Sequence, residues 1–216
     1  MHDVRVQKQR DYAIMKRHDN HMEDCIVLKQ TMPLVLASGS PRRREILQLM
    51  GLTYTVDASD VDETFSGGPE ETVLEISRRK AEAVAVRHPG ALVLAADTLV
   101  FAREPLGKPG CPERARQMLR ELSGSWHSVY TGMTLIDTGN GRCYQQADCT
   151  RVHVVPMTDA EIDAYVATGE PMDKAGAYAI QGMGGMFIDR IEGSHSNVIG
   201  LPMAALRSLL AEAGRA

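Results

Sequence analysis

Apolar residues along this chain fall into two patterns: short unbroken runs that favour strands, and spacings of three to four residues that favour helices. The first unit to show both begins with the apolar run Leu34–Leu36 and continues through a turn of small residues into a helical stripe over Pro41–Met50. Ser40 is predicted to cap that helix and Pro41 to be its first residue, because the N–H that proline lacks would be unpaired there anyway. The segment therefore predicts a strand, a tight turn and a helix.

The same criteria predict the remaining elements. Strands are expected at Thr53–Val56, Ala91–Ala102, Trp126–Ile136, Cys143–Val155 and Met186–Ile191, and helices at Pro69–Arg87, Pro112–Leu122, Thr158–Thr168 and from Pro202 onward. A Gly-Asn-Gly sequence at 139–141 separates two of these strands and is a strong hairpin signal. Thr158 and Glu161 form a capping box. Ser194–Asn197 is interpreted as a polar turn.

Three arginines, Arg42, Arg43 and Arg44, occupy the first turn of the helix that opens at Pro41. Cations are unfavourable at that position because the helix dipole places partial positive charge there. An anion that offsets this charge is expected, and phosphate fits, since free backbone N–H groups and forked guanidinium donors both suit its oxygens. The alternative is that the side chains extend into water, or that one of them pairs with Glu45.

Asp97 and Thr98 interrupt Ala91–Ala102, a stretch otherwise typical of a strand covered on both faces. A buried carboxylate needs a metal, a cation or hydrogen bonds, or its pKa rises until it becomes neutral. Asp97 is therefore a candidate for catalysis or metal binding. The alternative is that it ends one strand and caps a turn.

Two lysines are candidates for phosphate contacts. Lys80 follows Val73 by seven residues and falls on the inward stripe of its predicted helix. Its side chain either extends past the edge of the core to water or reaches a phosphate in a cleft. Lys108 stands between a glycine and a proline, on backbone that holds it out toward a ligand or toward solvent.

An acidic cluster follows the second predicted strand and consists of Asp57, Asp60, Asp62 and Glu63. Such a cluster is ordinarily a solvated loop. Because this one comes after an arginine-bearing helix, a divalent-cation or charge-balancing role is the alternative, and Glu63 is the residue singled out for it.

A glycine-rich segment near the C-terminus, Gly169–Gly185, carries Asp173, Lys174 and Gln181. Its backbone can approach a ligand closely, because glycine has no Cβ to hold the ligand away. The segment lacks the GxxxxGK[ST] pattern of a Walker-type loop, and no GxGxxG sequence follows a strand elsewhere in the chain.

Composition narrows the class of protein. The chain has 216 residues and a formal net charge of −4, which suits one large domain or two lobes and argues against a general nucleic-acid-binding surface. Cys25, Cys111, Cys143 and Cys149 are scattered without a CxxC pair. Two of them, Cys143 and Cys149, would lie roughly 20 Å apart on one strand, too far to bridge. Reduced thiols, together with the lack of a membrane-length apolar run or a signal-peptide core, predict a cytoplasmic location and no membrane association.

Residues 1–31 mix charges of both signs and show no sustained period. We expect them to form a poorly ordered extension or docking tail, and residues 32–216 to form a single catalytic domain that starts at Met32. The tail contains His2, His18 and His21, whose spacing is irregular. Metal binding by these histidines is the alternative to a solvated tail.

Seven motifs occur in a fixed order: LASGSPRRREIL, VDET, AADTLV, GKP, LSGSWHSVYTG, DKAGAYAIQG and GSHSNVIGLP. In this order and spacing the chain resembles the Maf family of nucleoside triphosphate pyrophosphatases, from Leu34 to about Leu210. The resemblance implies an α/β fold, with a mixed sheet flanked by helices and two lobes around a central cleft, and a homodimer. It also implies hydrolysis of a nucleoside triphosphate between the α and β phosphates, with Mg²⁺ or Mn²⁺ as the metal cofactor.

The family's functional residues can be carried over onto matching positions. Its phosphate-binding groups correspond to Ser38, Arg42, Arg43, Lys80 and Lys108. Its acidic groups correspond to Glu63 and Asp97, which the resemblance makes metal ligands, with Asp97 also the proton acceptor. The residues that are unusual for their local structure are thus the ones to which the family assigns a role.

Three positions separate the branches of the family. Arg42, Thr98 and Gln181 match the branch that prefers dTTP and UTP, whereas the branch that prefers 7-methyl-GTP usually has tryptophan, glutamine and glutamate there. Two departures from the family pattern are Ala179, where glycine is common, and His195, where tyrosine is common. The resemblance therefore implies a pyrimidine-specific enzyme, with Thr98 and Gln181 among its substrate-binding residues.

Other classes of function stay open. A regulatory protein that senses nucleotides without turnover, for example in cell division, would keep the basic cluster but would not need Asp97. A Maf-like enzyme with another substrate, such as 7-methyl-GTP, would keep both. A nucleic-acid-binding protein would need a wider basic face than this sequence offers, so no nucleic acid is expected as a partner.

Overall fold

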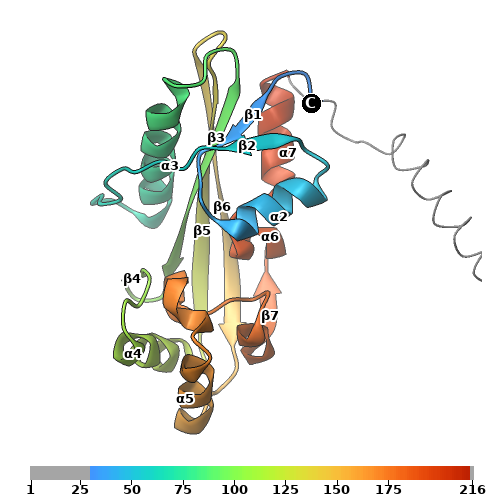
Figure 1. Ribbon diagram of the computed structural model, residues 1–216. Coiled ribbons are helices and arrows are strands. Elements are labelled where there is room, and N and C mark those ends of the chain that lie inside the picture. Colours follow the sequence, from blue (N-terminus) through green and yellow to red (C-terminus); the bar gives the residue numbers. More distant parts are fainter. Residues whose placement is uncertain (1–29, 215–216) are drawn as a thin grey trace, which may run out of the picture.

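The computed structural model describes residues 30–214 and contains a mixed sheet flanked by helices (Figure 1). The strands are β1 (Leu34–Leu36), β2 (Tyr54–Val56), β3 (Leu92–Phe101), β4 (Pro105–Leu106), β5 (Trp126–Asp137), β6 (Arg142–Val154) and β7 (Ile188–Glu192). The α-helices are α2 (Pro41–Leu49), α3 (Pro69–Ala85), α4 (Pro112–Leu122), α5 (Asp159–Ala167), α6 (His195–Ile199) and α7 (Met203–Glu212). Three short 3₁₀ helices are η1 (Glu170–Asp173), η2 (Ala175–Ala177) and η3 (Met183–Phe187).

The strand order of the sheet is β2-β1-β3-β5-β6-β7, with β4 added to the end of β3. Strands β2, β1 and β3 run parallel to one another, whereas β3, β5, β6 and β7 form antiparallel pairs. The predicted hairpin is confirmed: β5 and β6 pair along their whole length, and the Gly141 N–H closes the turn onto the carbonyl of Asp137. The fold class expected from the sequence, a mixed α/β sheet, is likewise confirmed.

Two lobes share the long strands β3, β5 and β6 (Figure 1). In the upper lobe, α2 and α7 pack on one face of the sheet around Leu94 and Leu135, and α3 packs on the other face around Val35 and Val93. In the lower lobe, α4, α5 and the 3₁₀ helices enclose a separate core that includes Tyr165. Each lobe therefore has its own apolar core, with one cluster on each face of the sheet in the upper lobe and one cluster in the lower lobe.

Some predicted elements differ from the structure. The segment Ser194–Asn197 is not a polar turn but opens α6, because the Ser194 hydroxyl accepts the Asn197 N–H as a helix cap. The last strand begins at Ile188 rather than Met186, because the backbone N–H groups of Met183 and Gly184 are held by Glu170 in a 3₁₀ turn.

Local predictions at two other sites also need correction. Ser40 does occupy the cap position of α2, but its side chain makes no cap bond; its backbone N–H instead donates to the Ser38 hydroxyl. The alternative in which Asp97 ends a strand is wrong, because β3 continues through Asp97 to Phe101. Cys143 and Cys149 lie on one strand, β6, as predicted, and among the described cysteines Cys111, Cys143 and Cys149 are free and exposed.

The chain before β1 is described only from Gln30 onward. The Gln30 side chain makes two hydrogen bonds with the backbone of Thr53, at 2.8 and 3.0 Å, and so joins the edge of the upper lobe. The predictions for His2, His18, His21 and Cys25 lie outside the described residues. Within residues 30–214, no helix is both long and apolar enough to cross a membrane.

Helix α3 approaches the sheet closely at Gly132. In the β3–β5 register Gly132 lies opposite Asp97, and a Cβ at position 132 would come within 2.4 Å of the backbone carbonyl of Val73 on α3. The missing side chain therefore lets the backbone of α3 lie directly against β5. Two turns further along the same inward stripe, α3 carries Lys80.

We predict that Gly132→Ala will lower the free energy of unfolding by about 1–3 kcal/mol, the usual range for overpacking a well-packed interior. The expected cause is displacement of α3 from β5. Urea denaturation of the variant and the wild type measures the change. Gly107→Ala is the matched control, because a Cβ at position 107 meets no atom within 4 Å. Equal stability of Gly132→Ala and wild type would contradict the close packing described here.

Candidate active site

A cleft of about 1170 Å³ lies between the two lobes. It opens along the edge of β3, where β1 pairs only with Leu92–Leu94 and β4 pairs only with Val100 and Phe101. Among the described strands, none covers that edge from Ala95 to Leu99. The middle of β3 is thus exposed to the cleft while the rest of the strand is buried in the sheet.

All nine residues that the sequence analysis assigned to a site line this one cleft. They are Ser38, Arg42, Arg43, Glu63, Lys80, Asp97, Thr98, Lys108 and Gln181. They come from α2 and the turn before it, the loop before α3, α3 itself, β3, the loop after β4, and the glycine-rich segment. The fold therefore brings together residues that are up to 143 positions apart in the sequence.

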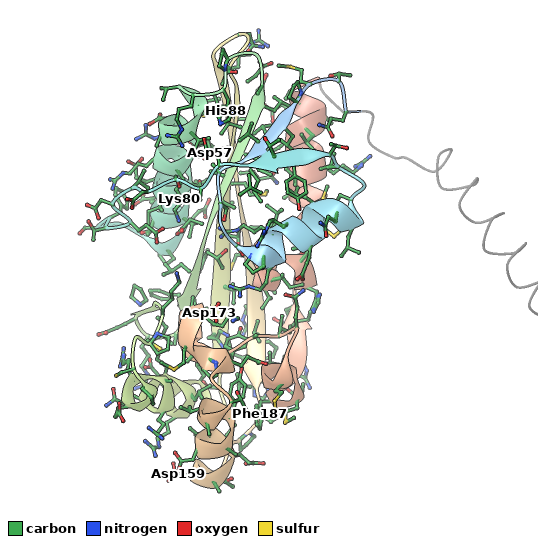
Figure 2. The ribbon with its side chains drawn as sticks, in the orientation of Figure 1. Asp57, Lys80, His88, Asp159, Asp173 and Phe187 are labelled. Atoms are coloured by element: carbon green, nitrogen blue, oxygen red, sulfur yellow. The ribbon has the colours of Figure 1, made fainter. Side chains whose placement is uncertain are left out.

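Lys80, which is labelled in Figure 2, lies between two acidic side chains of the cleft. Its Nζ is 2.7 Å from Asp97 Oδ1 and 2.8 Å from Glu63 Oε1. Because the side chain of Lys80 is only 10% exposed, it does not extend past the core to water as one alternative held. The side chain of Asp97 is 14% exposed and that of Glu63 is 61% exposed. The ammonium group therefore balances two carboxylates, one from the sheet and one from a loop.

Arg43 lies on the opposite face of β3 from Lys80, since Asp97 and Thr98 are adjacent on the strand and point to opposite faces. Its guanidinium donates to the carbonyl of Gly200 at 2.9 Å, to Ser38 Oγ at 2.9 Å and to Thr98 Oγ1 at 3.2 Å. Three of its five N–H groups are thus used within the protein. Burial lowers the pKa of Arg43 and the nearby Asp97 carboxylate raises it; burial dominates.

Thr98 is held between Arg43 and the sheet. Its hydroxyl lies 3.0 Å from the Thr131 hydroxyl, which in turn donates to the carbonyl of Asn197 at 3.1 Å. The Asn197 side-chain amide donates to the Val129 carbonyl and to the Thr150 hydroxyl, both at 2.9 Å. A chain of polar groups therefore fixes one wall of the cleft, and Thr98 is part of that wall.

The other positively charged side chains that line the cleft differ in their ion-pair partners. Arg42 on α2 lies 3.6 Å from Asp173 on η1, so this ion pair spans the two lobes (Figure 2 labels Asp173 in the lower lobe). Lys174 contacts the carboxylate of Asp173 and the backbone of Glu170. Lys108 is exposed and makes no ion pair or hydrogen bond with the part of the chain that the structure describes. Positive charge on the lower wall is thus partly uncompensated.

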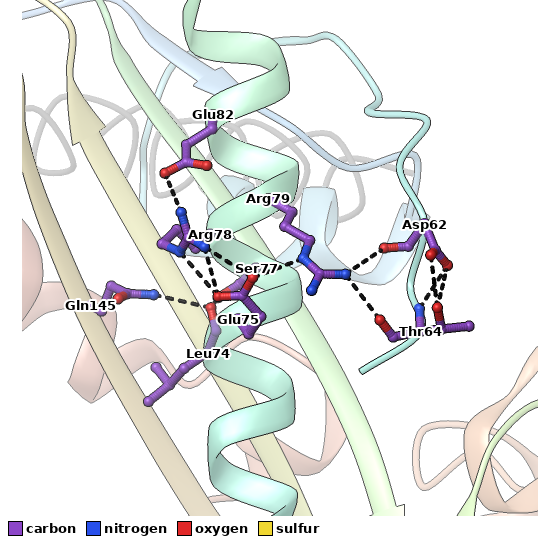
Figure 3. A network of polar contacts seen from close by, with 9 residues as sticks. All are labelled: Asp62, Thr64, Leu74, Glu75, Ser77, Arg78, Arg79, Glu82 and Gln145. Atoms are coloured by element: carbon purple, nitrogen blue, oxygen red, sulfur yellow. Dashed lines mark hydrogen bonds and ion pairs between the residues drawn. The ribbon is translucent and has the colours of Figure 1, made fainter. Parts of the chain in front are cut away.

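The loop that carries Glu63 is held by α3 (Figure 3). Arg79 donates to the carbonyls of Asp62 and Thr64, the residues on either side of Glu63, at 3.4 and 2.9 Å. Glu75, one turn earlier on α3, accepts the Arg79 Nε–H at 2.8 Å and so orients the guanidinium. The predicted charge-balancing role of the acidic cluster is therefore seen at Glu63, which is brought to Lys80 by its neighbour Arg79.

Comparison with known proteins decides the family. The profile of the family described as Maf-like protein matches residues 33–213. The chain belongs to the Maf-like protein family. It is 46% identical over 175 residues to a dTTP/UTP pyrophosphatase of Halalkalibacterium halodurans, a match that covers 80% of this chain and 91% of that protein. A dTTP/UTP pyrophosphatase of Anaeromyxobacter dehalogenans is 50% identical over 186 residues, which are 84% of this chain and 94% of that protein.

A solved structure shows a similar fold at lower sequence identity. A HAM1 protein from Coxiella burnetii superimposes with a TM-score of 0.51 and 18% sequence identity, over 84% of this chain and all of that one. This likeness concerns the fold alone. The family match confirms the resemblance that the seven sequence motifs indicated.

The donor set of this Maf-like chain suits a hard divalent cation. Asp97 Oδ2 and Glu63 Oε2 make no hydrogen bond or ion pair within residues 30–214, while the other oxygen of each carboxylate contacts Lys80. Across the same residues, no group of three or more His, Cys, Asp or Glu side chains could hold a metal. Because Mg²⁺ is commonly held by one or two carboxylates plus substrate phosphates, these two side chains fit a cation that arrives with the nucleotide.

Sequence reasoning assigned no role to Tyr178, although this residue lines the cleft. Its hydroxyl lies 2.8 Å from His127 Nε2 on β5, and burial raises the pKa of Tyr178. The sequence held only a weak signal for this pair, a histidine on an otherwise ordinary strand. The imidazole of His127 is 3% exposed, and its Nδ1 has no partner in the described part of the protein.

Burial lowers the pKa of His127 to about 4. In the unfolded chain a histidine titrates near pH 6.5, so between that pH and about pH 4 the unfolded chain binds a proton that the folded protein does not. The free energy of unfolding therefore falls as pH drops through this window, and His127 has no such effect above it.

We predict that His127 removes about 3 kcal/mol of stability between pH 7 and pH 4. The test is urea denaturation of wild type and His127→Gln at both pH values, since glutamine keeps a polar side chain but does not titrate. The difference in unfolding free energy between the two proteins should shift in favour of the variant by this amount at pH 4. A difference that is the same at both pH values would rule out a neutral buried histidine.

Proposed function

We propose that this protein hydrolyses dTTP and UTP, and related modified pyrimidine triphosphates, to the monophosphate and pyrophosphate in a reaction that requires Mg²⁺ or Mn²⁺. The curated relatives that match nearly the whole folded chain bear the name dTTP/UTP pyrophosphatase. The observation that carries the proposal is the pairing of Asp97 and Lys80 at the uncovered edge of β3, in a cleft that also holds arginines and an unpaired lysine.

The basic residues bind and orient the triphosphate. Lys108 is free to contact it, Arg42 is paired only at 3.6 Å with Asp173, and Arg43 keeps two N–H groups beyond those it uses within the protein. Phosphoryl transfer depends mainly on positioning and on stabilisation of charge that develops in the transition state. These cations therefore stabilise the negative charge that builds up on the departing pyrophosphate.

Glu63 and Asp97 would hold the divalent cation through the carboxylate oxygens that do not contact Lys80. When bound, such a cation lowers the pKa of a water molecule and neutralises phosphate charge. Lys80 keeps both carboxylates directed into the cleft, since its ammonium group touches each of them. Ser38, on the same wall as Arg43, contributes a hydroxyl for the phosphate oxygens.

Asp97 acts as the general base. Its carboxylate accepts a proton from water while the water oxygen forms a bond to the α-phosphorus, and the bond from that phosphorus to the bridging oxygen breaks, with its electron pair leaving on pyrophosphate. Asp97 is part of strand β3, and its carboxylate is paired with Lys80. The position of the carboxylate is therefore set before the substrate arrives.

Gln181 recognises the base. Its side chain is exposed, lines the cleft and has no hydrogen-bond partner in the described protein. A glutamine amide offers both a donor and an acceptor to the edge of thymine or uracil. A purine would be rejected partly by its size and partly because polar groups would be left unpaired. Thr98 accepts a hydrogen bond from Arg43 and so supports the wall of the cleft that is proposed to bind the phosphates.

Two further features belong to the proposal. A cytoplasmic location is supported by the free, exposed thiols of Cys111, Cys143 and Cys149, since disulfides dominate in oxidising compartments. A homodimer is proposed from the family resemblance. The proposal also keeps two predictions made from the sequence: an N-terminal extension at residues 1–31 and a single catalytic domain at residues 32–216.

We predict that Asp97→Asn lowers kcat for dTTP at least about a hundredfold, the lower range for loss of a general base. The nucleotide should still bind, because the basic residues are unchanged and Glu63 remains paired with Lys80. Pyrophosphate release with Mg²⁺ or Mn²⁺ measures turnover, and calorimetry without turnover measures binding. Asp148→Asn on β6 makes the same change outside the cleft and should retain full activity. A fully active Asp97→Asn variant would refute the mechanism; an inactive wild type that binds nucleotides would favour a sensor.

We predict that Gln181→Glu lowers kcat/KM for dTTP and UTP by about tenfold, because the carboxylate loses the donor and faces a carbonyl of the base. The preference for these nucleotides over dATP and 7-methyl-GTP should decline with it. A panel of triphosphates assayed for pyrophosphate gives the ranking. Gln48→Glu, on an exposed position of α2 outside the cleft, controls for the added charge. An unaltered substrate ranking would show that the base is selected elsewhere.

A further inference from the structure

A partly buried carboxylate outside the cleft, that of Glu170, binds the segment that carries Gln181. Glu170 accepts three hydrogen bonds: from the Tyr165 hydroxyl at 2.7 Å and from the backbone N–H groups of Gly184 and Met183, both at 3.0 Å. Neither Glu170 nor Tyr165 lines the cleft. The contact therefore joins the C-terminal side of the Gln181 segment to the rigid lower lobe without touching the space for the nucleotide.

The hydroxyl of Tyr165 makes a hydrogen bond with the N-terminal side of the same segment. It accepts the backbone N–H of Ala179 at 3.1 Å while donating to Glu170. Tyr165 is 2% exposed and belongs to the core of the lower lobe. One tyrosine and one glutamate thus hold the backbone two residues before Gln181 and two and three residues after it. We call Tyr165 and Glu170 the brace.

The segment is shaped to accept the brace. A Cβ at Gly182 would lie 2.2 Å from Glu170 Oε2, so only glycine allows the backbone to approach the carboxylate this closely. Burial raises the pKa of Glu170, but the bonds from Tyr165, Gly184 and Met183 outweigh burial and lower it below its ordinary value. Glu170 is therefore an ionised carboxylate, an acceptor-only group that matches three donors.

Strain at the start of the segment indicates that its conformation is imposed from outside. Ala177 has a φ of +59°, and it is the described residue other than glycine with positive φ. Such backbone persists only where surrounding contacts over-determine it. The next residue, Tyr178, is held by His127 at 2.8 Å. Gln181, with no bond of its own, therefore takes its position from a backbone that is fixed on both sides.

We propose that Tyr165 and Glu170 are positioning residues that set nucleobase selectivity by fixing the backbone on both sides of Gln181. This inference rests on the proposed function, in which Gln181 contacts the base. Most of the groups that act on the phosphates lie on β3, α2, α3 and the loops that lead into these helices, and Lys108 lies on the loop after β4; the hydrogen bonds of the brace involve none of them. Loss of the brace should therefore affect discrimination between bases and leave the chemical step largely intact.

The test is Tyr165→Phe, which removes the hydroxyl and keeps the ring in the core. We expect KM for dTTP to rise and the preference for dTTP over dATP, as a ratio of kcat/KM, to fall by about tenfold, with kcat within about twofold of wild type. Hydrogen exchange should also become faster at the amides of Ala179, Met183 and Gly184. Tyr144→Phe, on β6 against the upper core, is the matched control and should change neither the ratio nor the exchange.

A second variant, Glu170→Gln, replaces one accepting oxygen by a donor and should reduce the ratio at least as much as Tyr165→Phe. It keeps the inference testable if Tyr165→Phe does not fold, which thermal melting of each variant would reveal. A fall in kcat for every nucleotide with an unchanged ratio would assign the brace a merely structural role and overturn the proposal. Unchanged hydrogen exchange at the amides of Ala179, Met183 and Gly184 would also overturn the proposal.

Selectivity is also measured as the ratio of the two dissociation constants, Kd for dATP divided by Kd for dTTP, in the absence of metal. Absence of turnover in the wild type would refute the proposed function alone. In that case, a Kd ratio that declines in the brace variants would still support the inference, and a Kd ratio that they leave unchanged would overturn it. The two failures can therefore be told apart.

Discussion

The arrangement of the cleft depends on one buried lysine. Lys80 reaches the sheet from α3 and pairs with Asp97 on β3 and with Glu63 on a loop, at 2.7 and 2.8 Å. An ammonium group taken out of water this far is tolerated only with opposite charge beside it, and a buried pair that loses one partner is strongly destabilised. The lysine therefore obliges the two carboxylates to converge, and their convergence is what makes the site suitable for a divalent cation and a polyphosphate.

The distance between helix and sheet makes this pairing possible. Gly132 on β5 is paired with Asp97 on the neighbouring strand β3 and has no side chain, so the backbone of α3 lies against β5 at Val73. From Val73 the buried side of α3 continues along the sheet to Lys80. On the other face of β3, Thr98 meets Arg43 in a separate set of polar contacts. Two adjacent residues of one strand therefore organise the two walls of the cleft, because successive side chains of a strand point to opposite faces of the sheet.

The two lobes carry different parts of the proposed reaction. The upper lobe and the shared strand β3 supply the acidic pair, the arginines and Lys80, all fixed by helix and sheet. The lower lobe supplies Gln181 on irregular backbone, which would be a poor place for a selective contact if it were free to move. Bonds from Tyr165, Glu170 and His127 give that backbone the rigidity that regular secondary structure gives the upper lobe. Base selection therefore depends on the lower lobe, whereas most of the groups proposed to act on the phosphates belong to the upper lobe and to β3.

The sequence by itself determined most of the elements and the identity of the charged groups. Helix α4 lies where predicted, at Pro112–Leu122, because its apolar spacing and its stop signal are both local. The arginines after Ser40 and the acid within an apolar strand were recognisable because each is unfavourable for its own local structure. Short elements such as α6 were missed, since five residues show no periodicity and the helix is held by Asn197 against distant strands.

Only the tertiary structure decided which charges meet and what holds them. No spacing rule indicates that Lys80 rather than water would face Asp97, or that Arg79 would place Glu63, because these contacts depend on how closely α3 packs on the sheet. The same holds for the brace: Tyr165, Glu170 and Gly184 carry no recognisable motif, and their hydrogen bonds exist only once a helix and a glycine-rich loop are packed together. Local sequence fixes propensity and charge, whereas the pairing of buried polar groups is set by three-dimensional packing.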